Sequence, residues 1–381
     1  MSKPIKVLVV ISNLTHGGAE RQVVELANRV DPVRVELHVC SLSNYCPLAK
    51  FLKFPDKFHV LEKKAKYDVS LIFKLASFLR KNKFDLVHGF LYDAELASRL
   101  AGFLAGTQVV VGSERNSNNN FGRLKTLIYT WTSGCMDMCI ANSSAGAEFG
   151  QKAFSIPQKK YAVIHNGVDT QRFCSRESAM TRQDLGVSGN TKIVGMVGSY
   201  KRQKNHAFLV EAIAEVKKQY KDVVFVFVGS VIKEGPEATT EYYDSVQACV
   251  ERLDVRDMCV FVDARNDIEE FFNLCDFTVL PSLFEGTPNV VLESLACAVP
   301  VIATDVADNR FVIPDEKAGY IVPLGEVAIL AEKILDLLGD EEKLSAMSDY
   351  ARTWVCEQFG LDKMAGKFED IYYKLLSEQQ S

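Results

Sequence analysis

Short runs of Val, Ile and Leu alternate along the chain with longer stretches in which apolar residues recur at helical spacing. A short apolar run bounded by turn residues predicts a buried strand, and an amphipathic stretch predicts a helix with one face in a core. In the first half, the pattern predicts strands at 6–12, 35–41, 86–89, 108–113, 138–141 and 161–164, and helices at 19–29, 70–81, 93–105, 123–133 and 144–154. In the second half, it predicts strands at 192–197, 223–228, 260–261, 277–280 and 299–304, and helices at 206–219, 241–253, 268–273, 289–297 and 327–337.

Strands that alternate with helices through short connections indicate parallel sheets covered by helices on both faces. The Asn166-Gly167 turn and the polar segment 170–190 interrupt this alternation. The sequence therefore predicts an α/β protein with two doubly wound, Rossmann-like domains, at 1–170 and 171–361. In such sheets ligands bind at the carboxyl ends of the strands, so the two binding edges are expected to face each other across a crevice.

Composition narrows the class of protein. The chain of 381 residues is 48% hydrophobic and 24% charged, which is typical of globular domains, and it contains no apolar run long enough to cross a membrane. Residues 3–11 fit a first buried strand better than a secretory signal, so we expect a cytoplasmic protein. The ten cysteines are scattered without metal-ligand spacing, and no metal site or disulfide is predicted.

Charge is divided unevenly between the halves. Residues 1–175 hold 23 of the 44 Lys and Arg but only 14 of the 49 Asp and Glu, which leaves 21 against 35 for the rest. A basic half favours an anionic partner, such as the cytoplasmic face of the inner membrane. Segment 50–58, with Lys63, Lys64 and Lys66, mixes aromatic and basic residues, as an interfacial patch does. A solvated loop with a few core Phe side chains explains the pattern equally well, and no nucleic-acid-binding motif is present.

Two glutamates, Glu285 and Glu293, bracket the start of a predicted helix. The strand at 277–280 is followed by Gly286 and Pro288, which favour a turn, and the helix begins near Asn289. The first turn of such a helix presents unpaired N–H groups to an anion, typically a phosphate. Carboxylates beside it suit sugar hydroxyls, although a glutamate in a first helical turn also stabilises the helix dipole without any ligand.

Two further loops follow strands and carry features of phosphate sites. Residues 198–206 begin with Gly198 and contain three cations within four positions, including Lys204. Gly17 and Gly18 follow the first strand and allow close approach of backbone N–H groups to a ligand. The latter loop lacks the Gly-x-Gly-x-x-Gly fingerprint, which weakens an interpretation as a dinucleotide-binding domain.

Residues 284–300 closely resemble the Glu-x7-Glu signature of the retaining glycosyltransferases of family 4, which have the GT-B fold. The resemblance continues through 298–305, the Gly-Gly-Ala-Glu loop at 17–20 and the Asn-Gly-Val-Asp linker at 166–169. It implies a bacterial-type enzyme of surface-polysaccharide or lipid-linked glycan assembly, with an acceptor-binding first domain and a donor-binding second domain. It also implies that a C-terminal helix, about 362–381, crosses back onto the first domain.

The resemblance assigns roles by position. Glu285 and His88 match catalytic positions, although Phe90 stands where a second His is common in the family, and Ser199 stands where an Arg usually holds the diphosphate. Arg202 or Lys201 is expected to substitute for that Arg. The residues implied for donor binding are Gly17, Gly18, Ser199, Arg202, Lys204, Gly229, Arg265, Ile268, Gly286, Thr287, Pro288, Asn289, Val290 and Glu293. Those implied for the acceptor are His16, Glu114, Arg115 and Asn116, and no metal is implied.

The predicted reaction is transfer of a hexose or N-acetylhexosamine, with retention of configuration, from a nucleotide sugar to a lipid-linked or polysaccharide-precursor glycan. A UDP-sugar is the expected co-substrate, and no other cofactor is expected. No metal ion is predicted at the diphosphate, since no Asp-x-Asp motif is present. One alternative is a catalytically silent glycan-binding or scaffold subunit, which the residues at positions 199 and 90 would suit. Another is a GT-B nucleotide-sugar 2-epimerase.

Overall fold

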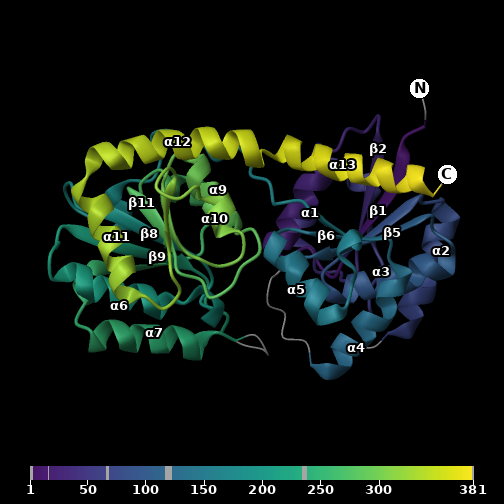
Figure 1. Ribbon diagram of the computed structural model, residues 1–381, viewed down its shortest axis with the longest axis horizontal. Coiled ribbons are helices and arrows are strands. Elements are labelled where there is room, and N and C mark those ends of the chain that lie inside the picture. The colour runs from purple at the N-terminus through teal and green to yellow at the C-terminus, as the bar shows by residue number, and fades with distance from the viewer. Residues whose placement is uncertain (1–2, 16, 66–67, 116–121, 234–237, 380–381) are drawn as a thin grey trace. The chain divides into compact units, whose positions relative to one another are not determined.

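The computed structural model describes residues 3–15, 17–65, 68–115, 122–233 and 238–379, and it divides the chain into two compact units (Figure 1). The first unit combines Met1–Gly167 with Leu361–Ser381, and the second is Val168–Gly360. The boundary therefore follows the Asn166-Gly167 turn, and the chain returns to the first unit at its end.

The first unit contains a parallel seven-stranded sheet in the order β3-β2-β1-β4-β5-β6-β7. Its strands are β1 Ile5–Ile11, β2 Val35–Ser41, β3 Phe58–Val60, β4 Leu86–Phe90, β5 Val109–Glu114, β6 Met138–Ala141 and β7 Tyr161–Val163. Its helices are α1 Gly18–Arg29, α2 Val69–Asn82, α3 Tyr92–Ala105, α4 Arg123–Thr132, α5 Ser144–Phe154 and α13 Leu361–Glu378.

Strand β1 shows why this sheet has helices on both faces. Val7 and Val9 point into a core shared with α1 and α13, whereas Leu8 and Val10 point into a core shared with α2 and α3. Because alternate side chains of a strand face opposite ways, an uninterrupted apolar run buries both faces. Helix α13, yellow in Figure 1, thus packs against α1 although the two are far apart in sequence.

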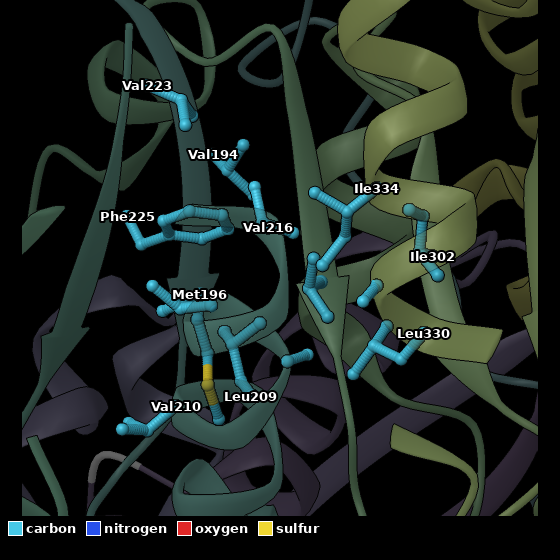
Figure 2. Close-up of a cluster of buried hydrophobic side chains, with 14 of the residues drawn as sticks. Val194, Met196, Leu209, Val210, Val216, Val223, Phe225, Ile302, Leu330 and Ile334 are labelled. Carbon is cyan, nitrogen blue, oxygen red and sulfur yellow. The ribbon is translucent and has the colours of Figure 1, made fainter. Parts of the chain in front are cut away.

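The second unit contains a parallel six-stranded sheet in the order β10-β9-β8-β11-β12-β13. Its strands are β8 Lys192–Val197, β9 Val223–Gly229, β10 Cys259–Asp263, β11 Phe277–Leu280, β12 Val301–Thr304 and β13 Gly319–Val322. Its helices are α6 His206–Lys217, α7 Thr240–Arg252, α8 Ile268–Phe272, α9 Asn289–Ala296, α10 Asn309–Val312, α11 Val327–Gly339 and α12 Glu341–Phe359. Figure 2 shows part of one of its two cores, in which Phe225 of β9 packs near Val194 of β8 and Val216 of α6.

Short 3-10 helices connect several of these elements: η1 Pro47–Phe51, η2 Pro55–Lys57, η3 Ser133–Cys135, η4 Gln158–Lys160, η5 Arg182–Leu185, η6 Arg202–Lys204 and η7 Arg256–Met258. In the described ranges, no helix has the length and apolar character needed to cross a bilayer. The two all-parallel sheets confirm the predicted doubly wound α/β class. All predicted strands and helices are present, whereas β3, β13, α10 and α12 were not predicted.

In each sheet, one pair of neighbouring strands marks the point where the chain reverses its direction of winding. These pairs are β1 and β4 in the first unit and β8 and β11 in the second. The loops at the carboxyl ends of such a pair lead to opposite faces of the sheet, which leaves a crevice between them for a ligand. The loops that follow β8 and β11 carry Lys204 and Glu285.

Candidate functional site

Lys204 and Glu285 meet at the switch point of the second unit. The ammonium Nζ of Lys204 lies 2.6 Å from Oε1 of Glu285, and both side chains are largely buried. The two residues are 81 positions apart in sequence and are brought together because β8 and β11 are neighbours in the sheet. The structure thus joins two of the predicted site residues in one charge-assisted hydrogen bond.

Hydrogen bonds fix the loop that carries Glu285. The Ser282 hydroxyl donates to Oε1 of Glu285 at 2.7 Å, and the Ser282 carbonyl accepts a bond from the Thr304 hydroxyl at 2.6 Å. The Gln203 carbonyl accepts the N–H of Leu283 at 2.8 Å, and the Gln203 side chain donates to the Phe284 carbonyl at 2.8 Å. The carboxylate is therefore held by the ends of β8, β11 and β12 at once.

Glycines bring the backbone of two neighbouring strand ends into contact beside this pair. A Cβ added at Gly229, at the end of β9, would overlap the carbonyl oxygen of Gly198 after β8. A Cβ at Gly198 would lie 3.3 Å from Cγ of Lys204, so the lysine stem packs on this glycine. Both glycines are needed for close packing and not for a left-handed backbone, since neither has positive φ.

The start of α9 lies directly after Glu285 in the chain. Gly286, Thr287 and Pro288 are buried, and Asn289 and Val290 open the helix in half-exposed positions. Glu293 follows one turn later and is also buried. The first-turn N–H groups and the positive end of the helix dipole are therefore next to two carboxylates, as the sequence predicted.

The negative charge of Glu293 also acts on Arg172. Burial lowers the pKa of Arg172, but its hydrogen bond to Glu269 and the charges of Glu269 and Glu293 outweigh burial and raise the pKa overall. The guanidinium donates to Oε2 of Glu269 at 2.7 Å. Arg172 remains a cation on the same unit as the candidate donor site.

Other predicted donor residues lie on neighbouring loops with partners of their own. Arg202 is exposed, with its guanidinium 3.7 Å from Glu241 and 5.7 Å from the centre of the Tyr242 ring. These residues line a hollow of about 350 Å³. Arg265 donates two bonds to Asp267, and the Ile268 side chain is buried in a core, so that only its backbone is available to a ligand.

The first unit presents its own loop at the end of β1. The side-chain oxygen of Asn13 accepts bonds from the N–H and the hydroxyl of Thr15, which fixes the turn before α1. A Cβ added at Gly17 would overlap the Glu20 carboxylate, so the loop can take this course only with glycine there unless Glu20 moves. Gly18 is the first residue of α1. His16 and Asn116, both predicted to contact the acceptor, lie outside the described residues.

His88 does not face an open crevice, contrary to the prediction. Its side chain is 0% exposed, with Nδ1 2.8 Å from the Tyr372 hydroxyl and Nε2 2.7 Å from the Ser113 hydroxyl. Burial lowers the pKa of His88 to about 3, and the Arg115 charge acts in the same direction. His88 is therefore a neutral core residue in this structure, because β4 is central in the sheet and α13 covers it.

Glu114 is the last residue of β5 and is buried, and Arg115 follows it in a partly buried position. The Arg115 guanidinium donates to the Asn166 side chain at 2.6 Å and lies over the Phe90 ring. Burial lowers the pKa of Arg115 to about 10, although the charges of Glu114 and Glu20 raise it. Phe90 therefore stacks with a cation where a second His had been expected.

Sequence reasoning missed Ser282, Gln203 and Thr304. Each is a small or neutral polar residue at a strand end or in a loop, and no spacing rule distinguishes it from an ordinary surface residue. The available signal was Ser282 directly after Pro281 at the end of a buried strand, since polar residues at the carboxyl end of parallel strands line binding sites.

Comparison with known proteins covers most of the chain. A family model described as "Glycosyltransferase Family 4" matches residues 16–172, and one described as "Glycosyl transferases group 1" matches residues 178–354. N-acetyl-alpha-D-glucosaminyl L-malate synthase of Bacillus anthracis is 26% identical over 330 residues, which cover 83% of this chain and 81% of the relative. UDP-Gal:alpha-D-GlcNAc-diphosphoundecaprenol alpha-1,3-galactosyltransferase of Escherichia coli is 25% identical over 319 residues, covering 81% and 80% of the two chains.

A solved structure shows the same fold. The crystal structure of the Anabaena protein HepE in complex with UDP superimposes with a TM-score of 0.85 at 19% sequence identity. The alignment covers 97% of this chain and 100% of HepE. The two parallel-sheet domains of this chain are those of the GT-B architecture.

Proposed function

The chain belongs to glycosyltransferase family 4, and we propose that it transfers a hexose or N-acetylhexosamine, with retention of configuration, from a UDP-sugar to a lipid-linked or polysaccharide-precursor glycan. The observation that carries this proposal is the Lys204–Glu285 pair at 2.6 Å across the switch point of the second sheet. A cation for the diphosphate and a carboxylate for the sugar are thus held next to the start of α9.

On the donor side, Lys204 and the first N–H groups of α9 receive the diphosphate, and Glu293 holds the ribose hydroxyls. Glu285 contacts the sugar and stabilises positive charge near the anomeric carbon. Arg202 or Lys201 supplies the second cation for the diphosphate, because Ser199 stands at the position where an Arg usually supplies it. Loop 264–268 receives the base through backbone groups, in keeping with the buried Ile268 side chain.

The reaction proceeds at the front face of the sugar. An acceptor hydroxyl oxygen attacks the anomeric carbon as the bond from that carbon to the diphosphate oxygen breaks, and the hydroxyl proton passes to the departing diphosphate. Lys204 and the helix dipole stabilise the developing negative charge, and no metal ion is required. His88, in the middle of β4, supports the fold and contacts neither donor nor acceptor.

The acceptor is proposed from the relatives and from the charge of the first unit. The E. coli relative is named for an acceptor linked to diphosphoundecaprenol, whereas the B. anthracis relative is named for L-malate, a small acid. The excess of Lys and Arg in residues 1–175 favours the lipid-linked diphosphate and an anionic membrane beside it. The enzyme then acts in the cytoplasm, at the inner face of the membrane, with its acceptor at the first unit.

A second candidate is a catalytically silent subunit that binds glycans. It is favoured by Ser199 at the usual arginine position and by the contacts of Arg202 with Glu241 and Tyr242. Binding of a nucleotide sugar without turnover by any acceptor would support it.

The test begins with thermal-shift screening against UDP-, GDP- and ADP-sugars. A donor present at 100 times its Kd adds about 2.7 kcal/mol of stability, which is readily seen as a shift in Tm. The stabilising donor is then incubated with a diphosphoundecaprenol-linked sugar or with L-malate, and products are identified by mass spectrometry. Transfer by the wild type and its loss in Glu285→Ala are expected; isomerised donor without acceptor would indicate an epimerase, and stabilisation by no donor would refute the proposal.

A further inference from the structure

Helix α4 carries a stripe of large apolar side chains on its outer face. Leu124, Leu127 and Trp131 are 67%, 65% and 88% exposed, and they recur at the i, i+3, i+7 spacing of one helix face. Ile128, between them in the helical projection, is half-buried. An indole exposed to this degree next to two exposed leucines is unusual for a surface that meets only water.

The opposite face of α4 is anchored in the first unit. Tyr129 and Thr132 are buried, and the Tyr129 hydroxyl donates to Oε1 of Glu95 at 2.6 Å. Arg99 donates to the Tyr129 carbonyl at 3.1 Å and to Oε1 of Glu95 at 2.5 Å. The buried Arg99–Glu95 pair thus binds Tyr129 at both its carbonyl and its hydroxyl. These bonds fix the rotation of α4 about its axis, so the apolar stripe is held facing outward.

Cations flank the stripe and acidic residues are absent from its neighbourhood in sequence. With ~3.6 residues per turn, Arg123 and Lys125 project on opposite sides of the line of leucines. The Lys125 ammonium lies over the Tyr92 ring at 5.2 Å, and Arg123 is exposed. No Asp or Glu occurs between Arg115 and Asp137. This combination of an apolar face, a Trp and flanking cations is typical of helices that lie in a membrane interface.

We propose that α4, labelled in Figure 1, inserts Leu124, Leu127 and Trp131 into the hydrocarbon boundary of an anionic lipid bilayer. The occupant is the lipid surface itself, and Arg123 pairs with its headgroups. This inference rests on the proposed function, since it places the enzyme on the membrane that holds a lipid-linked acceptor.

The position of α4 in the fold places the proposed membrane contact near the proposed acceptor site. The helix begins nine residues after Glu114, which ends β5 at the carboxyl edge of the first sheet. A bilayer against α4 therefore lies beside the edge where the acceptor is proposed to bind. The diphosphate end of the acceptor then reaches the site from the headgroup region without its hydrocarbon chain leaving the bilayer.

The basic and aromatic segment 50–58 fits such an insertion less well. Phe51 and Phe54 are exposed, but Lys50 and Lys57 lie over their rings at 5.1 and 4.9 Å. The Lys63 ammonium is 2.6 Å from Asp93, and Lys66 lies outside the described residues. This segment supplies positive charge near the surface, and α4 supplies the apolar contact.

The experiment uses the intrinsic fluorescence of Trp131. The chain has two tryptophans, and Trp354 of the second unit is replaced by Phe so that Trp131 alone reports. Emission is recorded as vesicles of phosphatidylcholine, or of phosphatidylcholine with phosphatidylglycerol, are added to the protein. We expect a blue shift and quenching by lipids brominated in their acyl chains, both stronger with phosphatidylglycerol.

Sedimentation with the same vesicles tests the stripe in the full chain. Leu127→Ser combined with Trp131→Ser is expected to weaken partitioning roughly tenfold or more, because the buried apolar area is lost. Leu324→Ser, at an exposed leucine of the second unit, is the matched control and should change nothing. Transfer to a short-chain, water-soluble acceptor should be the same in the stripe variant as in the wild type, which separates this proposal from the proposed reaction.

Three outcomes would overturn the proposal. The first is Trp131 emission that stays unchanged with both kinds of vesicle, and the second is sedimentation of the stripe variant like the wild type. A blue shift that grows with protein concentration in the absence of lipid would instead identify a second copy of the chain as the occupant.

Discussion

Replacing Glu285 by Gln is expected to abolish transfer but to strengthen binding of the nucleoside diphosphate. In the free protein Lys204 Nζ is 2.6 Å from Oε1 of Glu285, so the cation proposed to bind the diphosphate already has a partner. Gln keeps the size of the side chain and an oxygen for the Ser282 hydroxyl. It removes the charge that competes with the ligand for Lys204.

The size of the expected change in the Kd for UDP follows from the burial of Lys204 and Glu285, whose side chains are 17% and 8% exposed. Two unit charges at about 4 Å attract by roughly 4 kcal/mol at an effective dielectric constant of 20, and desolvation offsets most of this. A net competition of about 1.4 kcal/mol makes the Kd for UDP roughly tenfold lower in Glu285→Gln. In Lys204→Met the Kd should rise roughly tenfold to a hundredfold, because a charge-assisted hydrogen bond is lost.

Isothermal titration calorimetry with UDP on the wild type, both single variants and the double variant measures this coupling. If the pair is the cause, Glu285→Gln has no further effect in the Lys204→Met background. If Glu285→Gln tightens UDP binding equally in both backgrounds, the effects of the two substitutions are additive within about 0.3–0.5 kcal/mol. The carboxylate would then repel the ligand directly, and the reasoning from the pair would be refuted. Weaker UDP binding by Glu285→Gln alone would refute it as well.

Three further predictions concern buried contacts that stabilise the two units. Gly229→Ala should lower stability by about 1–3 kcal/mol in urea unfolding and weaken UDP binding, since the added Cβ overlaps the Gly198 carbonyl; wild-type behaviour would mean that the two loops separate freely. Burial lowers the pKa of His88 to about 3, whereas the pKa of an unfolded His is about 6.5. The folded state therefore binds fewer protons than the unfolded state, and the free energy of unfolding should fall as the pH drops below about 6.5, by about 2 kcal/mol at pH 5. His88→Gln should flatten that part of the stability profile, and an unchanged slope would contradict a neutral His88. Glu95→Gln should cost about 3–5 kcal/mol, because it leaves the buried Arg99 cation without its carboxylate counter-charge, whereas Glu148→Gln, at an exposed pair with Lys152, should cost less than about 1 kcal/mol.

Apolar periodicity was enough to predict the two sheets, because most residues of the central strands are buried and apolar, as in β1, β9 and β12. Strand β3 escaped prediction because its residues Phe58, His59 and Val60 lie at a sheet edge and are only partly buried. Helix α12 escaped because most of its 19 residues are polar, with the buried positions spread thinly among them.

The candidate site could be located from sequence only where a motif marked it. Glu285, Glu293 and Lys204 were found through spacing and resemblance, and the structure places Lys204 against Glu285. The state of His88 could not be found in this way, since its enclosure depends on Tyr372, which is 284 positions away in the sequence. Contacts between distant segments follow from topology and side-chain packing, and no local pattern reports them.

The return of the chain into the first unit has a consequence for biosynthesis. Helix α13 completes one core of the first unit with residues such as Leu361, Met364, Phe368 and Tyr372, and the buried members of that core outside α13 all lie before residue 165. The second unit, in contrast, is a continuous segment, Val168–Gly360. On the ribosome the second unit can close as soon as it emerges, while one face of the first sheet stays uncovered until α13 is made. The half of the protein that is synthesised first is therefore the half that finishes folding last.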